Sequence, residues 1–274
     1  MSERRVVLVT GSTDGIGRAT ARALAAGGAE VILHGRSKPK VEAALAGLTA
    51  ELPGATLHGV SFDLGSLEAV RRGAAQLLER HPDLHVLVNN AGIFATERML
   101  TADGIELTFA VNHVGPFLLT QLLTERLLAS VADGMPARVI NVSSIAHGRG
   151  KIAIDDLTLA SGWTGYSAYA QSKLANVMHA LSLASRHDPA QLVAYSLHPG
   201  VIGTKLLRQG FGPVSGAPQE QGAKTPTRLA AATTVVEPSG TYFNEGFATL
   251  PAHVARDAEM REQLWRASER LAGL

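Results

Sequence analysis

The strongest constraint on the fold is the alternation of short strand-like runs with longer amphipathic segments along the chain. Runs rich in Val, Ile and Leu predict strands at residues 5–10, 30–34, 56–61, 85–89, 138–142 and 191–197, with a weaker one at 241–243. Helical spacing of apolar residues predicts helices between and after them, at residues 15–27, 40–52, 66–80, 103–130, 168–187, 219–232 and 254–272. Strands that are joined through helices pair in parallel, because such a connection must cross over the sheet. We therefore expect an α/β protein with a doubly wound parallel sheet of about seven strands and helices on both faces.

Composition excludes several classes of protein. The 274 residues are 46% hydrophobic and 18% charged, which is typical of a globular protein with a substantial core. The formal net charge is +1 and the Lys and Arg residues form no long block, so we expect no nucleic-acid partner. The chain has no cysteine, and therefore no disulfide or thiolate metal site. The N-terminus leads directly into a strand and no apolar run is long enough to span a bilayer, so we expect a cytoplasmic protein without a membrane anchor.

No repeat or interdomain linker interrupts the pattern, so residues 1–274 are expected to form a single domain. The Gly/Pro-rich stretch 209–226 predicts a long loop inside this domain. Apolar residues are spread through 206–225 without strand or helix periodicity: Leu206, Leu207, Phe211 and Val214. A loop of this length inside a compact domain is usually functional or disordered, so we expect 206–225 to be a substrate lid, with a flexible surface connection as the alternative.

The turn after the first strand has the composition of a nucleotide-binding loop. Its glycines are spaced Gly-x-x-x-Gly-x-Gly, which differs from the common Gly-x-Gly-x-x-Gly fingerprint. Glycines allow the backbone to approach a pyrophosphate closely, and the following helix offers free N–H groups and a partial positive charge. The residues expected to bind a dinucleotide here are Gly11, Ser12, Thr13, Gly15, Ile16 and Gly17.

Further candidate residues follow the other predicted strands. Arg36 stands where dinucleotide folds often carry an acid for the ribose hydroxyls, and its guanidinium suits a 2′-phosphate, which favours NADP(H) over NAD(H). The carboxyl ends of parallel strands share one edge of a sheet, where open α/β sheets bind ligands. The other cofactor-binding candidates at this edge are Asp63, Leu64, Asn90, Ala91, Gly92, Pro199, Gly200, Ile202 and Thr204, and Ser144 follows the fifth strand.

The helix predicted at 168–187 carries a candidate catalytic pair. Tyr169 and Lys173 are four residues apart and therefore lie on one face of a helix. An ammonium near a phenol favours the phenolate, so we expect Lys173 to lower the pKa of Tyr169 and make it a general acid/base. The spacing alone is weak, and a surface lysine beside a half-buried tyrosine would give the same pattern. The other motifs favour the catalytic interpretation.

Together these motifs resemble the short-chain dehydrogenase/reductase family over nearly the whole chain. The matching segments, in order, are Thr10–Gly17, Asp63-Leu64, Asn89–Gly92, Asn112, Asn141–Ser144, Tyr169–Lys173 and Pro199–Thr204. Val111–Phe117, Ser172–Asn176 and Leu264-Trp265 look most like the branch of retinol dehydrogenases and the WW-domain oxidoreductase. The resemblance implies a Rossmann-like fold and NAD(P)-dependent interconversion of an alcohol and a carbonyl. The apolar residues of the predicted lid at 206–225 favour a small, fairly apolar substrate. In many relatives the helices at 103–130 and 168–187 build dimers, so the resemblance leaves a homodimer or homotetramer open for this chain, although its sequence does not establish an oligomer.

The resemblance also assigns roles to individual residues. Tyr169 is expected to be the general acid/base, Lys173 to hold the nicotinamide ribose, and Ser144 to hydrogen-bond the substrate oxygen. Asn112 is expected to take part in a proton relay. Two departures from the family are expected. No hydrophobic anchor is expected before the first strand, unlike in membrane-bound retinol dehydrogenases, and the long segment 147–165 is expected to shape the pocket.

Pro116 has a consequence that does not depend on the family. It lies inside the helix predicted at 103–130 and has no N–H, so the carbonyl of Asn112 loses its helical partner. That carbonyl can bind a water that extends a proton relay from Lys173, or the proline can simply kink the helix, and the sequence favours neither. His81 and His85 have a spacing like that of metal ligands, but Pro82 and the strand starting at His85 break the helix that would align them.

Two other functions use similar features. An epimerase or dehydratase can employ the same Tyr/Lys pair, although such relatives usually carry a longer C-terminal substrate domain. A non-catalytic NADP-binding sensor or scaffold often lacks the Tyr, Lys or Ser, and all three are present here. The sequence therefore favours an oxidoreductase.

Overall fold

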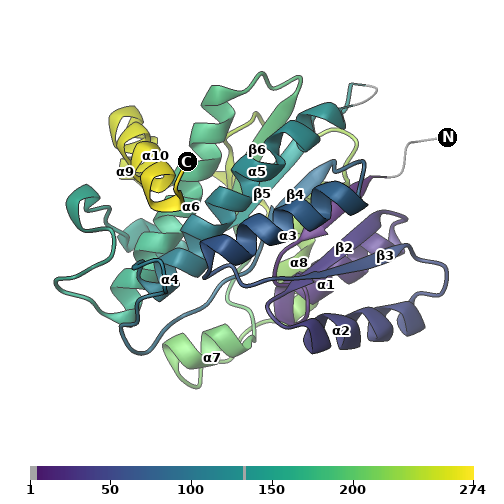
Figure 1. Cartoon of the computed structure of the whole chain (residues 1–274), viewed down its shortest axis with the longest axis horizontal. Helices are drawn as coiled ribbons and strands as arrows, with labels where there is room; N and C mark the ends of the chain where they lie inside the picture. The colour runs from purple at the N-terminus through teal and green to yellow at the C-terminus, as the bar shows by residue number, and fades with distance from the viewer. Residues whose placement is uncertain (1–4, 132–133) are drawn as a thin grey trace.

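One sheet of eight strands forms the centre of the molecule in the computed structural model, which describes residues 5–131 and 134–274 (Figure 1). The strands are β1 Val6–Val9, β2 Glu30–Gly35, β3 Leu57–Ser61, β4 Val86–Asn89, β5 Ala137–Val142, β6 Leu192–His198, β7 Tyr242–Asn244 and β8 Phe247–Thr249. Their order is β3-β2-β1-β4-β5-β6-β7-β8, and every pair is parallel except β7 and β8. The order reverses between β1 and β4, which opens a crevice at the carboxyl ends of the strands. The predicted doubly wound α/β sheet is confirmed.

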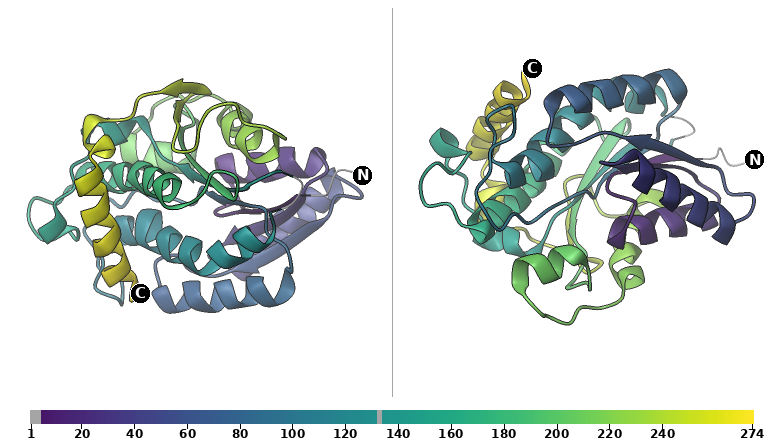
Figure 2. Two further views of the ribbon diagram at one scale, coloured as in Figure 1. Left: turned by 90° about the horizontal axis from the view of Figure 1, so that it is seen from above. Right: turned by 60° about the horizontal axis from the view of Figure 1, so that its bottom comes forward.

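Helices cover both faces of this sheet (Figure 2). One face packs against α1 Gly15–Ala26, α2 Lys38–Glu51 and α8 Gln219–Ala231, and the other against α3 Leu67–Arg80, α5 Gly115–Ala129 and α6 Gly165–Arg186. Along β1, Val7 and Val9 join the first layer whereas Val6 and Leu8 join the second, as the two-residue period of a strand requires. Each of these buried side chains contributes about 1.5–3 kcal/mol to stability.

The remaining helices are short or lie at the C-terminus. The helix predicted at 254–272 is divided at Asp257, which caps the second part, into α9 His253–Arg256 and α10 Ala258–Ala272, and α10 packs on α6. Short turns of 3-10 helix occur at η2 Ile145–Arg149 and η3 Ile154–Asp156.

The helix predicted at 103–130 is interrupted just before Pro116. It consists of α4 Leu107–Phe109, a π-helical turn η1 Ala110–Val114, and α5. The N–H of Gly115 donates to the carbonyl of Ala110, five residues earlier, so one extra residue is accommodated before the proline. Such π turns inside α-helices are frequent at functional sites, and this one contains Asn112.

Strand β8 was not predicted. It pairs antiparallel with β7 through the two-residue turn Glu245-Gly246, whose φ angles are 49° and 94°. Two positive φ angles define the type I′ turn, whose twist matches that of the flanking strands. The three residues of β8 are exposed, so they carry none of the alternation that a half-buried strand shows.

The prediction of a continuous loop at 209–226 is wrong in part. α7 Lys205–Phe211 begins at Thr204, whose hydroxyl accepts from the N–H of Leu207 at 3.2 Å, and α8 begins at Gln219. The connection between these helices is therefore only residues 212–218. The N-cap at Thr204 and the left-handed Gly212 (φ 77°) delimit a helix too short for its periodicity to be visible in the sequence.

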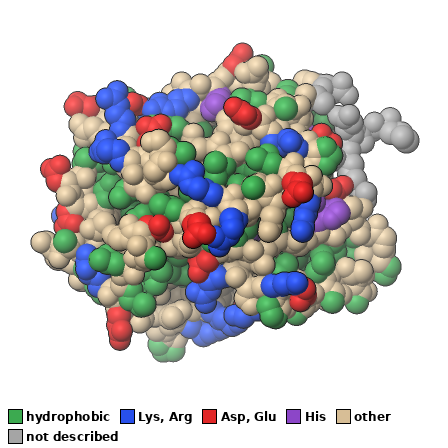
Figure 3. Space-filling view, in the orientation of Figure 1, with side chains coloured by type: hydrophobic (Ala, Val, Ile, Leu, Met, Phe, Trp, Pro, Cys, Tyr) green, Lys and Arg blue, Asp and Glu red, His purple; other side chains and the backbone are tan. Residues whose placement is uncertain are grey.

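Charged side chains of both signs are interspersed with apolar ones on the face shown in Figure 3, without a large patch of one sign. Among the described residues, no helix is both long and apolar enough to cross a membrane. Residues 1–4, on which part of the expected localisation depends, lie outside the described residues.

Candidate active site

The predicted site residues meet in a cavity of about 740 Å³ at the carboxyl edge of the sheet, a volume typical of sites for small molecules and cofactors. Its lining includes these predicted residues: Gly11, Thr13, Gly15, Ile16, Gly17, Arg36, Asp63, Leu64, Asn90, Ala91, Gly92, Ser144, Tyr169, Lys173, Pro199, Gly200, Ile202 and Thr204. Ser12 and Asn112 are buried beside the cavity and do not line it. No lining residue within the described part of the chain comes from the segment 147–165, contrary to our expectation.

The glycine-rich loop needs its glycines for tight packing. Gly11 has a φ of 64°, and a Cβ there would lie 2.8 Å from the Cα of Ala91. A Cβ on Gly17 would lie 2.3 Å from the carbonyl oxygen of Gly11. The loop is thus pressed against the segment after β4, and its backbone is open to the cavity. Ser12 faces inward, where its hydroxyl accepts from the N–H of His34 at 2.9 Å.

His34 is hydrogen-bonded to the glycine-rich loop and was not predicted as a site residue. Its Nδ1 accepts from the N–H of Gly11 at 3.2 Å, so Nε2 carries the proton that is shared with the carbonyl of Phe62 at 3.0 Å. Complete burial lowers the pKa of His34 to about 4, so the ring is neutral at pH 7 and keeps this arrangement. The sequence did contain a signal for His34, because it is a polar residue near the end of an otherwise apolar strand.

This histidine makes stability depend on pH. In the unfolded chain its pKa is about 6.5, so between pH 6.5 and 4 the unfolded state binds more protons and stability falls as the pH falls. We expect His34→Gln, whose amide can make both hydrogen bonds without titrating, to lose less stability than the wild type between pH 7 and 5. The difference should approach about 2 kcal/mol, measured by urea unfolding at both pH values. Parallel losses in the two proteins would contradict this role for His34.

Two cations lie at the end of the cavity next to β2. Arg36 follows β2 directly and is exposed, and Lys40 on α2 also lines the cavity. Lys40 was not predicted, because it lies within a helix beyond the strand end that the motif marks. A phosphate bound at this end would meet two positive charges, and the residue directly after β2 is a cation rather than the acid that holds a ribose diol in many dinucleotide folds.

The opposite end of the cavity contains Ser144, Tyr169 and Lys173, with the two helical residues buried at 5% and 3% exposure. Burial raises the pKa of Tyr169 to about 12, partly offset by a hydrogen bond with Ser144. Burial also lowers the pKa of Lys173 to about 8. The expected lowering of the tyrosine pKa by the lysine is therefore wrong for this structure. The Lys173 ammonium donates to the carbonyl of Val142 at 3.0 Å and lies 5.6 Å from the centre of the tyrosine ring.

Asn112 connects the site to its surroundings. Its amide accepts from the N–H of Ile93 at 2.8 Å and donates to Ile93 O and to Ser172 Oγ, both at 3.0 Å. Gly92 lies between this amide and the lysine, since a Cβ on Gly92 would be 3.5 Å from Asn112 Oδ1 and 3.3 Å from Lys173 Nζ. The Asn112 side chain therefore holds the segment after β4 against α6. The interpretation of its main-chain carbonyl stays open.

Helix α7 covers the catalytic end with apolar side chains. Leu206, Leu207 and Phe211 of α7, and Val214 in the connection after it, all line the cavity, as the lid hypothesis requires. The ring of Phe211 lies 6.0 Å from that of Tyr169 and 5.5 Å from that of Phe94, which also contacts the Tyr169 ring at 5.5 Å. Phe94 was missed because it is distant in sequence from both.

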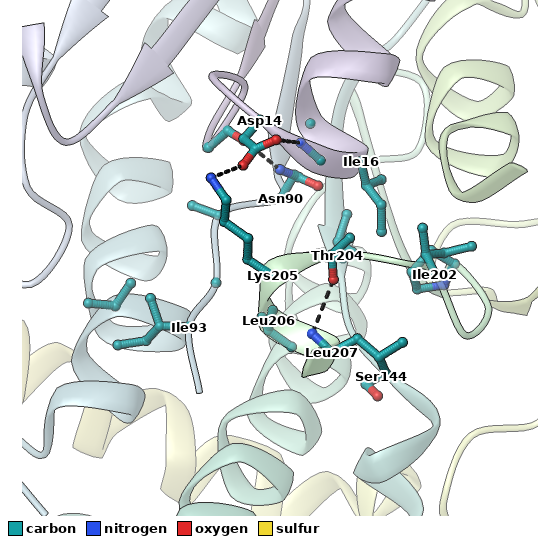
Figure 4. A pocket seen from close by; sticks show the side chains of 18 of the residues that line it. Asp14, Ile16, Asn90, Ile93, Ser144, Ile202, Thr204, Lys205, Leu206 and Leu207 are labelled. Carbon is teal, nitrogen blue, oxygen red and sulfur yellow. Dashed lines mark hydrogen bonds and ion pairs between the residues drawn. The ribbon is translucent and has the colours of Figure 1, made fainter. Parts of the chain in front are cut away.

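An ion pair joins α7 to the glycine-rich loop (Figure 4). Lys205 Nζ lies 2.8 Å from Asp14 Oδ2, and Asp14 Oδ1 accepts from the N–H of Gly15 as the N-cap of α1. Lys205 lowers the pKa of Asp14 through this contact. Both side chains are largely exposed, so the pair contributes little to stability.

The cavity fits a nicotinamide dinucleotide along its length. Arg36 and Lys40 stand at one end, the glycine-rich loop in the middle, and Lys173 at the other. The Lys173 ammonium is buried, and among the described residues it makes one hydrogen bond, so it retains N–H groups for ribose hydroxyls. These residues would therefore meet, in order, the 2′-phosphate, the pyrophosphate and the nicotinamide ribose of such a cofactor.

Comparisons with known proteins agree with this geometry. Residues 5–211 match the family model described as short chain dehydrogenase. Human retinol dehydrogenase 12 and mouse polyprenol dehydrogenase are each 37% identical, over 98% of this chain and 87% and 84% of their own lengths.

Solved structures give the same result. An uncharacterised protein from Mycobacterium paratuberculosis superposes with a TM-score of 0.81 at 33% identity, over 98% of this chain and 93% of its own. A short-chain dehydrogenase from Shigella flexneri, complexed with NADP, has a TM-score of 0.72 at 25% identity, over 88% of this chain and 96% of its own. This chain therefore belongs to the short-chain dehydrogenase/reductase family and is an NAD(P)-dependent oxidoreductase that acts on CH–OH groups.

Proposed function

We propose that the enzyme interconverts an alcohol with a ketone or aldehyde on a fairly apolar small molecule and prefers NADP(H) to NAD(H). The observation that carries this proposal is the position of Ser144, Tyr169 and Lys173 beneath the apolar side chains of α7. The names of two relatives, retinol dehydrogenase 12 and polyprenol dehydrogenase, refer to apolar alcohols, which supports the substrate class.

In this mechanism each side chain acts on the substrate oxygen or on the cofactor. A bound nicotinamide cofactor supplies or accepts the hydride. In the reducing direction the neutral phenol of Tyr169 donates its proton to the substrate oxygen, and Ser144 donates a hydrogen bond to the same oxygen. A pKa of about 12 keeps the phenol protonated at pH 7, which suits its role as a general acid. Lys173 would hold the ribose hydroxyls of the bound cofactor and so help to orient it beside Tyr169.

A panel of carbonyl compounds tests the proposed function. Oxidation of NADPH is followed with small and bulky ketones and aldehydes, each also assayed in the alcohol direction with NADP. We expect turnover to be highest with bulky apolar compounds. Absence of turnover with the whole panel in both directions, from a protein that binds NADPH, would contradict the proposed reaction class.

The same panel tests α7 as a substrate lid. We expect Phe211→Ala to raise KM roughly five- to tenfold for bulky apolar substrates and much less for small ones, because the lost ring contacts only a large substrate. Phe247→Ala is the matched control, since this phenylalanine on β8 is 76% exposed and does not line the cavity. Equal KM changes for small and bulky substrates would remove the specificity role of Phe211.

A further inference from the structure

Three potential metal ligands meet at the amino ends of strands β2 and β3, on the side of the sheet away from the active site at the carboxyl ends. Glu30 begins β2, four residues before His34 at the cavity, His58 lies on β3, and His81 directly follows α3. One ligand atom from each of Glu30, His58 and His81 lies within 4.8 Å of the other two. These residues take no part in the proposed reaction.

The fold itself brings these residues together. His58 pairs with Ile32 in the β2–β3 register, and Glu30 lies two residues before Ile32, so both side chains emerge on the same face of the sheet. Helix α3 covers that face and ends at Arg80. The carbonyl of the next residue, His81, accepts a hydrogen bond from Arg126 of α5. The cluster is therefore attached to two strands and a helix, and its third member is held in place.

Both imidazoles approach one carboxylate oxygen. His58 Nε2 is 3.1 Å and His81 Nδ1 is 4.0 Å from Glu30 Oε1, and the two rings lie edge to face at 4.9 Å. Their side chains are 42% and 12% exposed, and that of Glu30 is 23% exposed, so an ion can enter from solvent.

Two imidazoles and a carboxylate form a donor set that binds zinc and related divalent transition metals, with water as a further ligand. We propose that Glu30, His58 and His81 form a binding site for such an ion, with Zn²⁺ as its representative, which joins the edge strand β3 and the end of α3 to β2. Zinc holds nitrogen and oxygen ligands at about 2.0–2.1 Å, which places ligand atoms about 3.4 Å apart. The three ligand atoms lie within 4.8 Å of one another, so they reach this arrangement by shifts of about 1.4 Å or less, within the freedom of partly exposed side chains.

Two neighbouring charges have opposite effects on cation binding at this site. The carboxylate of Glu30 attracts a cation, whereas the positive charge of Arg80 is close enough to affect His81 and opposes one. His85, the other histidine of the pair that the sequence suggests, accepts a hydrogen bond from the N–H of Val6 at its Nδ1 and is not part of the cluster.

The experiment measures binding of Zn²⁺ to the full-length protein after removal of metal with EDTA. We expect competition with a chromophoric chelator to show one zinc ion per chain, and zinc at a hundredfold excess over Kd to raise Tm by roughly 5 °C. His58→Gln and Glu30→Gln should each weaken zinc binding at least about tenfold, because each deletes one of three protein ligands. At the same zinc concentration the Tm increase should therefore fall to about half or less.

The matched control is His253→Gln, which removes an exposed histidine from α9 and should leave zinc binding unchanged. His58 is partly exposed, so its substitution is compatible with folding, and NADPH binding of each variant verifies an intact fold. The absence of stoichiometric zinc, or equal zinc affinity in the wild type, His58→Gln and Glu30→Gln, would overturn the proposal. The measurement does not depend on turnover, so it is independent of the proposed function.

Discussion

Tyr169→Phe is expected to lower kcat by about 100- to 10,000-fold while leaving the Kd for NADPH nearly unchanged. The substitution removes the proton donor, and a positioned general acid contributes about that factor to the rate. The phenyl ring retains the contact that Tyr169 makes with Phe94, so the site should keep its shape. Steady-state kinetics with a substrate identified from the carbonyl panel, together with fluorescence titration of NADPH, measures both quantities.

Two further variants make this prediction specific. Tyr166→Phe removes a neighbouring hydroxyl from the same helix, on a residue that is 38% exposed and does not line the cavity, and should retain wild-type turnover. Lys173→Ala should impair both turnover and NADPH binding, because the lysine is assigned to the ribose as well as to the geometry of the site. Near-wild-type kcat in Tyr169→Phe would exclude Tyr169 as the proton donor.

The sequence predicted the sheet well because the central strands are buried on both faces. The residues of strands such as β4 and β5 are all buried and mostly apolar, and such runs are visible without any knowledge of the fold. β8 and α7 were missed because each is short and neither has a continuous buried face. Their ends are set by local turn geometry at Glu245, Gly246 and Gly212, which has only a weak signal in sequence.

The functional residues were likewise predicted only in part. Residues in motifs, such as Gly17 and Tyr169, were predicted because their chemistry requires fixed local spacing. Residues that converge from distant segments were missed, among them Phe94 beside Tyr169 and Glu30 beside His58, because only the strand register and helix packing bring them together. The direction of the Tyr169 pKa shift was also predicted wrongly, since it depends on burial, which a sequence motif does not reveal.

Arg36→Asp is expected to exchange the cofactor preference. Arg36 is exposed at the end of β2 and lines the cavity together with Lys40, where a 2′-phosphate would be neutralised. Loss of a charge-assisted contact to phosphate costs about 1.5–3 kcal/mol, which corresponds to an about ten- to hundredfold weaker affinity for NADPH. The new carboxylate repels a phosphate and accepts hydrogen bonds from ribose hydroxyls, so the affinity for NADH should be unchanged or improved.

Titration of NADPH and NADH against the wild type and Arg36→Asp measures this exchange, and Lys38→Asp is the matched control. Lys38 is the first residue of α2, two residues after Arg36, and its side chain is 77% exposed, but it pairs with Glu42 and does not line the cavity. The control therefore makes the same change in net charge close to the site without removing a proposed phosphate ligand. Because Lys40 remains in Arg36→Asp, some preference for NADPH can persist, and the ratio of the two Kd values is the decisive quantity. A ratio that does not change in Arg36→Asp, or that changes equally in Lys38→Asp, would show that Arg36 does not select the cofactor.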